Sequence, residues 1–157
     1  MDNLPSQIQC ACPCGATTFH ATAKPLLRFI CHCTICQAVY QKPFADIVAF
    51  RLGDVVASEA HPVSFKRHRL PPAVNRGVCP ACNAPAFGHL SLLPGYGFTF
   101  VPTANLRDGV EVPGASLHSF YDRRQHDVAD DLPKVSGYWP SQWAVSTRLM
   151  AARFRRS

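Results

Sequence analysis

Eight cysteines in 157 residues fall into three short clusters and one isolated position. The clusters are Cys12-Pro-Cys14-Gly, Cys31-His-Cys33-Thr-Ile-Cys36 and Cys79-Pro-Ala-Cys82, and the isolated residue is Cys10. Thiolates at such short spacings are typical zinc ligands, since two sulfur atoms on one tight turn can occupy two vertices of a tetrahedral site. The spacing therefore indicates metal chemistry before any other chemistry.

A count of ligands divides these cysteines into two sites and a remainder. A closed structural zinc site takes four thiolates, and the two outer clusters supply Cys12, Cys14, Cys79 and Cys82. The middle cluster then offers three ligands: Cys31, Cys33 and Cys36. Three protein ligands with one open vertex form the arrangement of a catalytic zinc. We therefore expect a structural zinc and a second, reactive zinc, with Cys10 left without a role.

Three alternatives to two zinc sites stay open at this point. The cysteines could form disulfides, a single four-cysteine site could leave the other thiols inert, or an iron–sulfur cluster could use Cys10 with the middle cluster. The first twenty residues show no basic segment followed by an apolar stretch, so we expect the cytoplasm, where disulfides are rare. The longest uncharged run, residues 77–106, holds four prolines, and we expect no membrane span.

The elements that position these clusters are predicted to be short strands. The chain has 14 prolines and 47% hydrophobic residues but only 17% charged ones, which favours strands joined by turns over a helical bundle. β-branched, aromatic and alternating patterns predict strands at 19–23, 25–30, 44–50, 62–68, 96–101 and 114–121, with a turn at Gly53-Asp54. Ser141 is expected to cap a helix from Gln142 to about Phe154. The predicted fold is mainly β, a zinc-clasped set of small antiparallel sheets with a short C-terminal helix.

The positive charge is concentrated at the end of the chain. The net charge is +6, and four arginines in the last ten residues (Arg148, Arg153, Arg155 and Arg156) account for four of these charges. Cations at a helix C-terminus interact favourably with the helix dipole. We therefore expect a zinc-binding β domain at 1–140 and a basic helical appendage at 141–157, and a nucleic-acid partner is not expected.

The order of the three clusters resembles the glutathione-dependent formaldehyde-activating enzyme family, which includes centromere protein V. The similar elements are Cys-x-Cys-Gly, Cys-His-Cys-x-x-Cys-Gln at 31–37 and Cys-x-x-Cys, and the resemblance spans roughly residues 7–140. His118, followed by Asp131-Leu132-Pro133, is similar to the family's C-terminal pattern. Asn83 stands where the family usually has glycine, and asparagine tolerates positive φ. His126 stands in place of a tryptophan.

This resemblance implies a fold, a cofactor and an activity. The fold would be a tent of small antiparallel sheets around a structural zinc held by the outer clusters, with a second zinc on Cys31, Cys33 and Cys36 as the catalytic group. The activity would be addition of glutathione to formaldehyde, classed as a carbon–sulfur lyase for the reverse direction. A small thiol such as glutathione would be the partner, bound as thiolate beside a carbonyl carbon.

The alternative function is a non-catalytic zinc module that binds protein or nucleic acid. For the enzyme, an anionic thiol requires basic side chains, and the candidates are Arg28, Lys42, Arg76 and Arg107. His32, Gln37 and His118 are candidate polar groups near the site, although the simplest interpretation of both histidines is structural. Tyr96, Phe98 and Phe100 are interpreted mainly as core, with one of them as a candidate wall of a pocket, and Trp139 and Trp143 are further candidates for such a wall. The sequence leaves the thiol, the aldehyde and the oligomeric state open.

Overall fold

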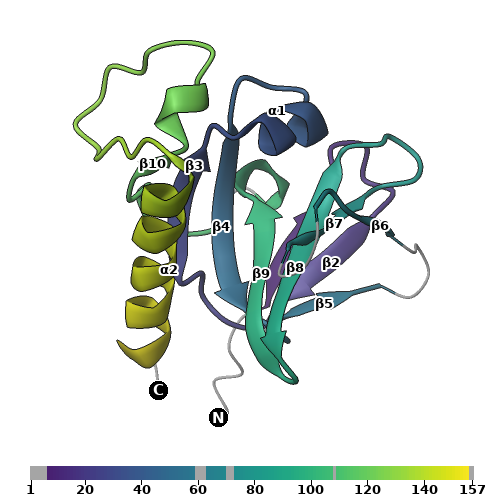
Figure 1. Cartoon of the computed structure of the whole chain (residues 1–157). Coiled ribbons are helices and arrows are strands. Elements are labelled where there is room, and N and C mark those ends of the chain that lie inside the picture. The colour runs from purple at the N-terminus through teal and green to yellow at the C-terminus, as the bar shows by residue number, and fades with distance from the viewer. Residues whose placement is uncertain (1–6, 59–62, 70–72, 108, 156–157) are drawn as a thin grey trace.

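The computed structural model describes residues 7–58, 63–69, 73–107 and 109–155, which form two β-sheets, with the C-terminal helix along one side and a short helix at the top of the view (Figure 1). The smaller sheet is antiparallel, in the order β1 (Ile8–Ala11), β2 (Thr18–Ala21), β5 (Val55–Ala57). The larger sheet has the order β10 (His118–Ser119), β3 (Leu27–Cys31), β4 (Ala45–Arg51), β9 (Tyr96–Pro102), β8 (Pro85–Leu93), β7 (Asn75–Val78), β6 (Ser64–Arg67). The prediction of a mainly β fold is confirmed, except that β10 runs parallel to β3, so the larger sheet is mixed.

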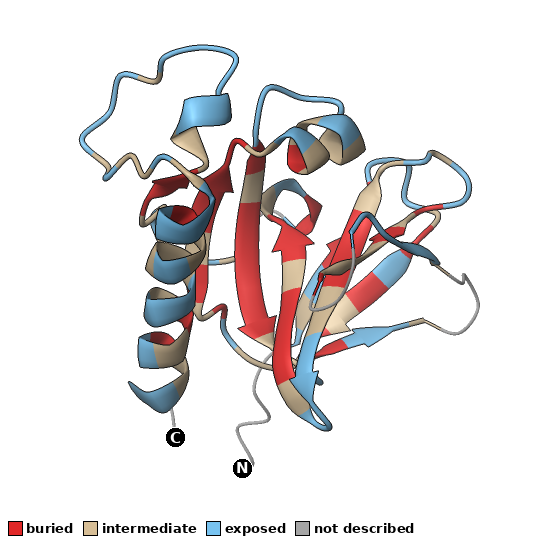
Figure 2. Ribbon diagram, in the orientation of Figure 1, coloured by how far each residue is buried: buried red, intermediate tan, exposed pale blue. Residues whose placement is uncertain are grey.

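Strand β4 is buried on both faces and separates two hydrophobic cores (Figure 2). Val48 and Phe50 face the first core, which lies between the sheets, whereas Ile47 and Ala49 face the second core. This division follows from the period of two along a strand. The second core also receives Leu149 from the C-terminal helix, and it borders the middle cysteine cluster.

A short helix, α1 (Thr34–Tyr40), follows β3 directly and was not predicted from the sequence. Cys33 caps it, because the Cys33 sulfur accepts a hydrogen bond from the backbone nitrogen of Cys36 at 3.3 Å. Gln41 ends it in the left-handed conformation at φ 51°. The three-residue spacing from Cys33 to Cys36 therefore also allows the Cys33 side chain to cap the helix.

The C-terminal helix, α2 (Tyr138–Arg155), is confirmed, but its predicted start was wrong. It begins four residues before Gln142, with Pro140 in the first turn, where the missing N–H of proline costs nothing. Ser141 is fully buried inside the helix instead of capping it. The Ser141 hydroxyl accepts a hydrogen bond from the Phe120 backbone nitrogen at 2.8 Å and donates to the Val135 carbonyl oxygen at 3.3 Å.

Most of the predicted strands are found within two residues of their expected bounds. The strand predicted at 62–68 is β6, with residue 62 outside the described residues. The strand predicted at 114–121 is reduced to β10 and is followed by the short 3-10 turn η2 (Tyr121–Arg123). A second such turn, η1 (Thr103–Asn105), follows β9. Among the helices described, none is long and apolar enough to cross a membrane.

Candidate metal centres and active site

The two outer clusters meet in space and form a four-cysteine group. Cys12 and Cys14 lie on the turn after β1, and Cys79 and Cys82 lie on the turn between β7 and β8. Their four sulfur atoms lie within 4.8 Å of one another, with Cys12 Sγ to Cys14 Sγ at 3.4 Å and Cys14 Sγ to Cys79 Sγ at 3.8 Å. A tetrahedral site with Zn–S bonds of about 2.3 Å separates its sulfur atoms by about 3.8 Å. The geometry therefore fits the zinc ion expected from the sequence.

Backbone and side-chain donors around Cys79 favour its thiolate. The Thr17 side chain, followed by the backbone N–H groups of Cys82 and Ala81, lowers the pKa of the Cys79 thiol to about 6. The Thr17 backbone nitrogen also donates to the Cys12 sulfur at 3.3 Å. Asn83 takes φ 60° and donates its N–H to the Cys79 carbonyl oxygen at 2.7 Å. It therefore adopts the left-handed backbone conformation for which glycine is usually found at this position. Donors that stabilise thiolates suit a metal site.

The middle cluster forms a second, three-cysteine group. Cys31 ends β3, Cys33 caps α1 and Cys36 lies in the first turn of that helix. Their sulfur atoms also lie within 4.8 Å of one another. Cys31 and Cys36 are buried, whereas Cys33 is half-buried. If the three sulfur atoms bound one tetrahedral metal ion, its fourth coordination position would be left for another group.

These three thiols compete for ionisation. Hydrogen bonds from Cys31 and then Cys36 hold the pKa of Cys33 far below its usual range. The pKa of Cys31 is raised well above its usual value by Cys33, Cys36 and burial. Cys31 lowers the pKa of Cys36, but Cys33 and burial outweigh this and raise it to about 11. The protein alone thus stabilises one thiolate here, and a divalent cation fits the donor set because its charge allows all three thiols to ionise.

The isolated Cys10 belongs to neither group. It is 2% exposed in the first core, and burial raises the pKa of its thiol to about 11. A thiol that stays protonated is a poor nucleophile and a poor metal ligand. The structure therefore gives Cys10 the character of a small core residue.

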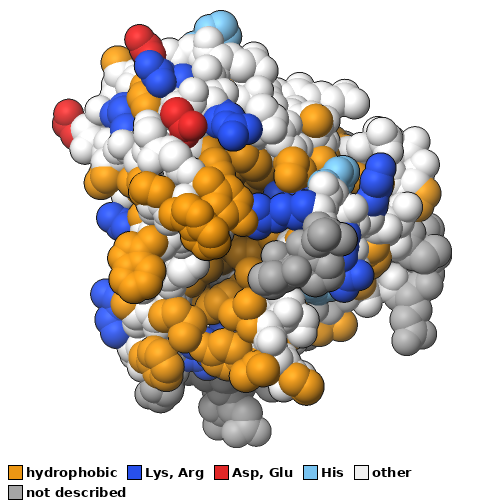
Figure 3. Space-filling view, viewed as in Figure 1, with side chains coloured by type: hydrophobic (Ala, Val, Ile, Leu, Met, Phe, Trp, Pro, Cys, Tyr) orange, Lys and Arg blue, Asp and Glu red, His pale blue; other side chains and the backbone are white. Residues whose placement is uncertain are grey.

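The three-cysteine group opens onto a cavity of about 760 Å³ between the larger sheet, α1 and α2. In Figure 3, hydrophobic side chains gather around a hollow beside α2, with basic side chains along its upper edge. The cations that line this cavity are Arg69, Arg76 and Arg123, and none of the described lining residues is acidic. Apart from the cysteine thiolates, the charged side chains that an anionic ligand meets among the described lining residues are therefore all positive.

Arg76 is the basic candidate that the structure selects from the sequence prediction. Its guanidinium Nη2 lies 3.7 Å from the Cys36 sulfur. Arg28 is instead held by Asp46, with a shortest distance of 2.7 Å, and neither Lys42 nor Arg107 lines the cavity.

The sequence did not indicate Arg69 or Arg123. Arg69 donates to the Tyr138 hydroxyl at 2.8 Å, and Arg123 lies on η2. Both reach the cavity through long-range packing, for which the local sequence carries no signal.

A buried histidine pair lies behind the three-cysteine group. His32 Nε2 lies 2.9 Å from His118 Nδ1, and His118 Nε2 lies 2.7 Å from Asp130 Oδ2. Burial, followed by the charges of His118 and Arg124, lowers the pKa of His32 to about 4. Both rings are 2% exposed or less, so the structural interpretation of the two histidines is the one the geometry supports. The acid in this network is Asp130, which directly precedes the Asp131-Leu132-Pro133 segment noted in the sequence.

Gln37 connects α1 to the segment after β10. Its side-chain nitrogen donates to the backbone oxygen atoms of His32 at 2.7 Å and Arg123 at 2.8 Å. Its side-chain oxygen accepts a hydrogen bond from Gln125 at 2.9 Å. Gln37 therefore links α1 to the segment that contains Arg123, which lines the cavity. Gln37 itself is not among the lining residues.

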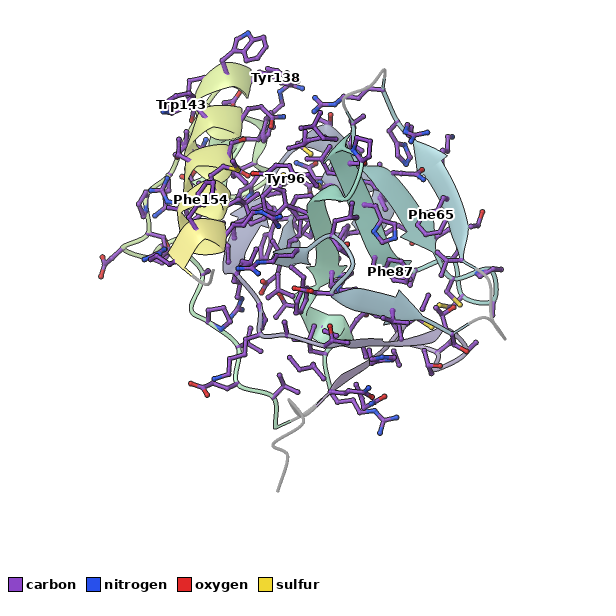
Figure 4. All side chains as sticks on the ribbon, turned by 90° about the horizontal axis from the view of Figure 1, so that it is seen from below. Phe65, Phe87, Tyr96, Tyr138, Trp143 and Phe154 are labelled. Carbon is purple, nitrogen blue, oxygen red and sulfur yellow. The ribbon has the colours of Figure 1, made fainter. Side chains whose placement is uncertain are left out.

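The predicted aromatic residues separate into core and cavity. Phe98 is buried in the second core, and Phe100 and Trp139 line the cavity. Figure 4 shows Tyr96 between α2 and the strands, and Trp143 on the side of α2 that faces away from them. Trp143 is 74% exposed and is not among the residues that line the cavity, so of the two tryptophans only Trp139 forms part of its wall.

The comparisons with known proteins agree with this geometry. No curated protein matches the chain. A family model described as "Glutathione-dependent formaldehyde-activating enzyme" matches residues 7–123, which include all three cysteine clusters and all the described strands of both sheets. The match covers more than half of the chain. The chain therefore belongs to the glutathione-dependent formaldehyde-activating enzyme family.

Proposed function

We propose that the protein is a zinc-dependent enzyme of the carbon–sulfur lyase type, which makes and breaks the adduct of a small thiol with an aldehyde. Glutathione and formaldehyde are the pair that the family suggests. The observation that carries the proposal is the position of the three-cysteine group in the wall of a large cavity with three arginines. A purely structural metal site would need no such cavity.

Each cysteine group has a separate part in this proposal. Cys12, Cys14, Cys79 and Cys82 would hold a structural zinc. Cys31, Cys33 and Cys36 would hold the second zinc, which when bound supplies a vertex at which an incoming thiol loses its proton more easily. We assign catalysis to this second group because all three of its cysteines line the cavity, where a substrate thiol could reach a bound ion.

The protein's own residues bind and orient the two reactants. Arg76, with Arg69 and Arg123, would bind the carboxylates of glutathione, since guanidinium groups pair well with carboxylates. The apolar walls exclude water and so strengthen these charge interactions. In the addition, the thiol sulfur forms a bond to the carbonyl carbon, the C=O π electrons move to the oxygen, and that oxygen takes up a proton. Cleavage is the reverse of each step.

Elemental analysis combined with turnover tests this proposal. We expect two zinc ions per chain in the wild type, and one in Cys36→Ser with loss of turnover of glutathione and formaldehyde. Cys10→Ser is the matched control, since it removes a buried cysteine outside both groups and should keep both ions and the activity. If Cys36→Ser loses the second zinc but turns over every tested thiol–aldehyde pair like the wild type, the proposal is wrong.

The alternative function, a non-catalytic module that binds protein or nucleic acid, would use the basic C-terminal segment. Part of this segment is engaged with the sheet: the Arg153 guanidinium lies over the Tyr96 ring at 4.4 Å, and the Arg153 carbonyl oxygen accepts a hydrogen bond from Arg51 at 2.9 Å. Arg156 lies outside the described residues. These contacts support a structural role for the segment.

The division into a domain at 1–140 and an appendage at 141–157 stays a prediction. Leu149 of the appendage is 3% exposed and packs in the second core, so we propose that the domain depends on it. The cytoplasmic location likewise stays an expectation.

A further inference from the structure

The cavity extends away from the three-cysteine group along an apolar face of the larger sheet. On β3, Cys31 and Phe29 are two residues apart and therefore lie on the same face. Ile47 on β4 pairs with Phe29, and Phe100 on β9 pairs with the neighbouring Ala49. Phe29, Ile47 and Phe100 all line the cavity. Beyond the sulfur atoms, this wall of the cavity is therefore hydrocarbon.

Two further walls have the same character. On β8, Gly88, Leu90 and Leu92 alternate along one face and all line the cavity. From the other side, α2 contributes Val145 and Leu149, which are four residues apart and so lie on one face of the helix. The space between the strands and α2 is thus lined mainly by apolar side chains, with Gln142 and Ser146 of α2 among the polar exceptions, whereas Arg76 lies next to the sulfur atoms.

Formaldehyde and glutathione do not match this space well. Formaldehyde contributes a single carbon to the adduct, and glutathione is a polar peptide without an extended hydrocarbon part. Leu92 is 45% exposed, so this wall presents apolar surface that the protein itself does not cover. Exposed apolar surface next to a reactive site indicates binding of an apolar group, because each buried methylene improves affinity by about fourfold.

We propose that the preferred aldehyde carries an apolar chain or ring of several carbons, so that the substrate is an anionic thiol adduct with an apolar arm. This inference rests on the proposed function, which places the substrate sulfur at the three-cysteine group. The anionic part of the thiol lies toward the arginines, and the carbon chain runs between β8, β9 and α2. The chemistry is unchanged: one S–C bond forms, and the thiol proton is replaced by a proton on the former carbonyl oxygen.

Binding of unreactive thioethers tests the apolar arm separately from catalysis. The probes are S-methylglutathione and S-hexylglutathione, titrated calorimetrically into the zinc-loaded protein. We expect the hexyl compound to bind at least about thirtyfold more tightly, which corresponds to burial of between two and three of its five additional methylenes. Affinities within threefold of each other, or no binding of either compound, would overturn the inference.

Two neighbouring leucines supply a matched pair of variants. Leu92 lines the cavity, whereas Leu93, at 64% exposure, does not, and neither is buried enough to threaten folding. We expect Leu92→Ser to weaken binding of S-hexylglutathione by about five- to tenfold and to leave S-methylglutathione unchanged. Leu93→Ser should change neither affinity. Equal effects of the two substitutions on the hexyl compound would place the arm elsewhere and refute the assignment.

Turnover separates this inference from the function on which it rests. We expect the rate increase over the uncatalysed reaction with glutathione to be larger for hexanal than for formaldehyde. Turnover of formaldehyde alone, without a chain-length effect on binding, would leave the lyase function intact and overturn the apolar arm. Chain-length-dependent binding without turnover of any aldehyde would support the apolar arm and overturn the lyase function.

Discussion

Arg76 offers the sharpest test of how the cavity recognises an anionic thiol. It lies on β7, is half-buried, and places its guanidinium Nη2 3.7 Å from the Cys36 sulfur. A hydrogen bond to a charged partner contributes about 1.5–3 kcal/mol, and partial exposure favours the lower half of this range. Arg76→Gln should therefore lower kcat/KM for glutathione by about 13- to 45-fold.

The assay compares two thiols with the same aldehyde. Glutathione carries carboxylates, whereas 2-mercaptoethanol is uncharged and cannot use the guanidinium. We expect Arg76→Gln to impair the reaction of glutathione and to change that of 2-mercaptoethanol by less than threefold. Arg67→Gln is the control, since it removes the same charge from the neighbouring strand β6 at an exposed position outside the cavity.

The result that refutes this reasoning is an equal loss for both thiols with an unchanged zinc content. Such a loss would mean that Arg76 acts on the cysteine group and not on the charge of the thiol. The zinc content must be measured in each variant, because Arg76 also contributes to the field around Cys33 and Cys36. An unchanged reaction of glutathione in Arg76→Gln would refute the binding role outright.

Three further predictions concern stability and ligand detection. Ser141→Ala removes a fully buried hydroxyl and leaves a backbone N–H without its partner, so it should lower the free energy of unfolding in urea by about 1–3 kcal/mol. The pKa of Asp130 is lowered by its contacts with a lysine and a histidine, so the carboxylate stabilises the fold above about pH 4 and this contribution is lost as the pH falls. Asp130→Asn should therefore reduce the melting temperature at pH 7 and flatten its decline in acid, whereas Asp131→Asn should follow the wild type. Of the two tryptophans, Trp139 lines the cavity, so S-hexylglutathione should change the fluorescence of Trp143→Phe but not that of Trp139→Phe.

The strands that the sequence predicted are those with regular apolar or aromatic alternation. β4 and β9 are examples, because both have hydrophobic side chains at successive inward positions. β7 (Asn75–Val78) and β8 (Pro85–Leu93) were missed, since the first contains Arg76 and Gly77 and the second interrupts its apolar residues with glycine, histidine and serine. Their pairing is set by neighbouring strands and by the cysteine turn between them, which local propensity does not describe.

The two cysteine groups were predictable for a different reason from the cavity. Ligand spacing within each turn is a local property, and the chemistry of zinc fixes how many turns must meet. The cavity depends on where α2 packs, and the start of α2 was misjudged because Ser141 has the side chain of a capping residue. Its hydroxyl bonds instead to Phe120, which takes φ 53° at the edge of the cavity. Contacts between residues this far apart in sequence have no local signature.

The two cysteine groups differ in what they connect, and this difference supports their separate roles. The four-cysteine group joins the turn after β1 to the turn after β7, so an ion bound there would close a loop of 65 residues between Cys14 and Cys79. Closing such a loop removes much of the freedom of the unfolded chain and stabilises the fold. The three-cysteine group draws all its ligands from residues 31–36, a segment already fixed by β3 and α1. An ion bound there would connect no distant parts of the chain. Because such an ion would add little to the fold, its position at the wall of the cavity is better explained by binding and chemistry than by stability.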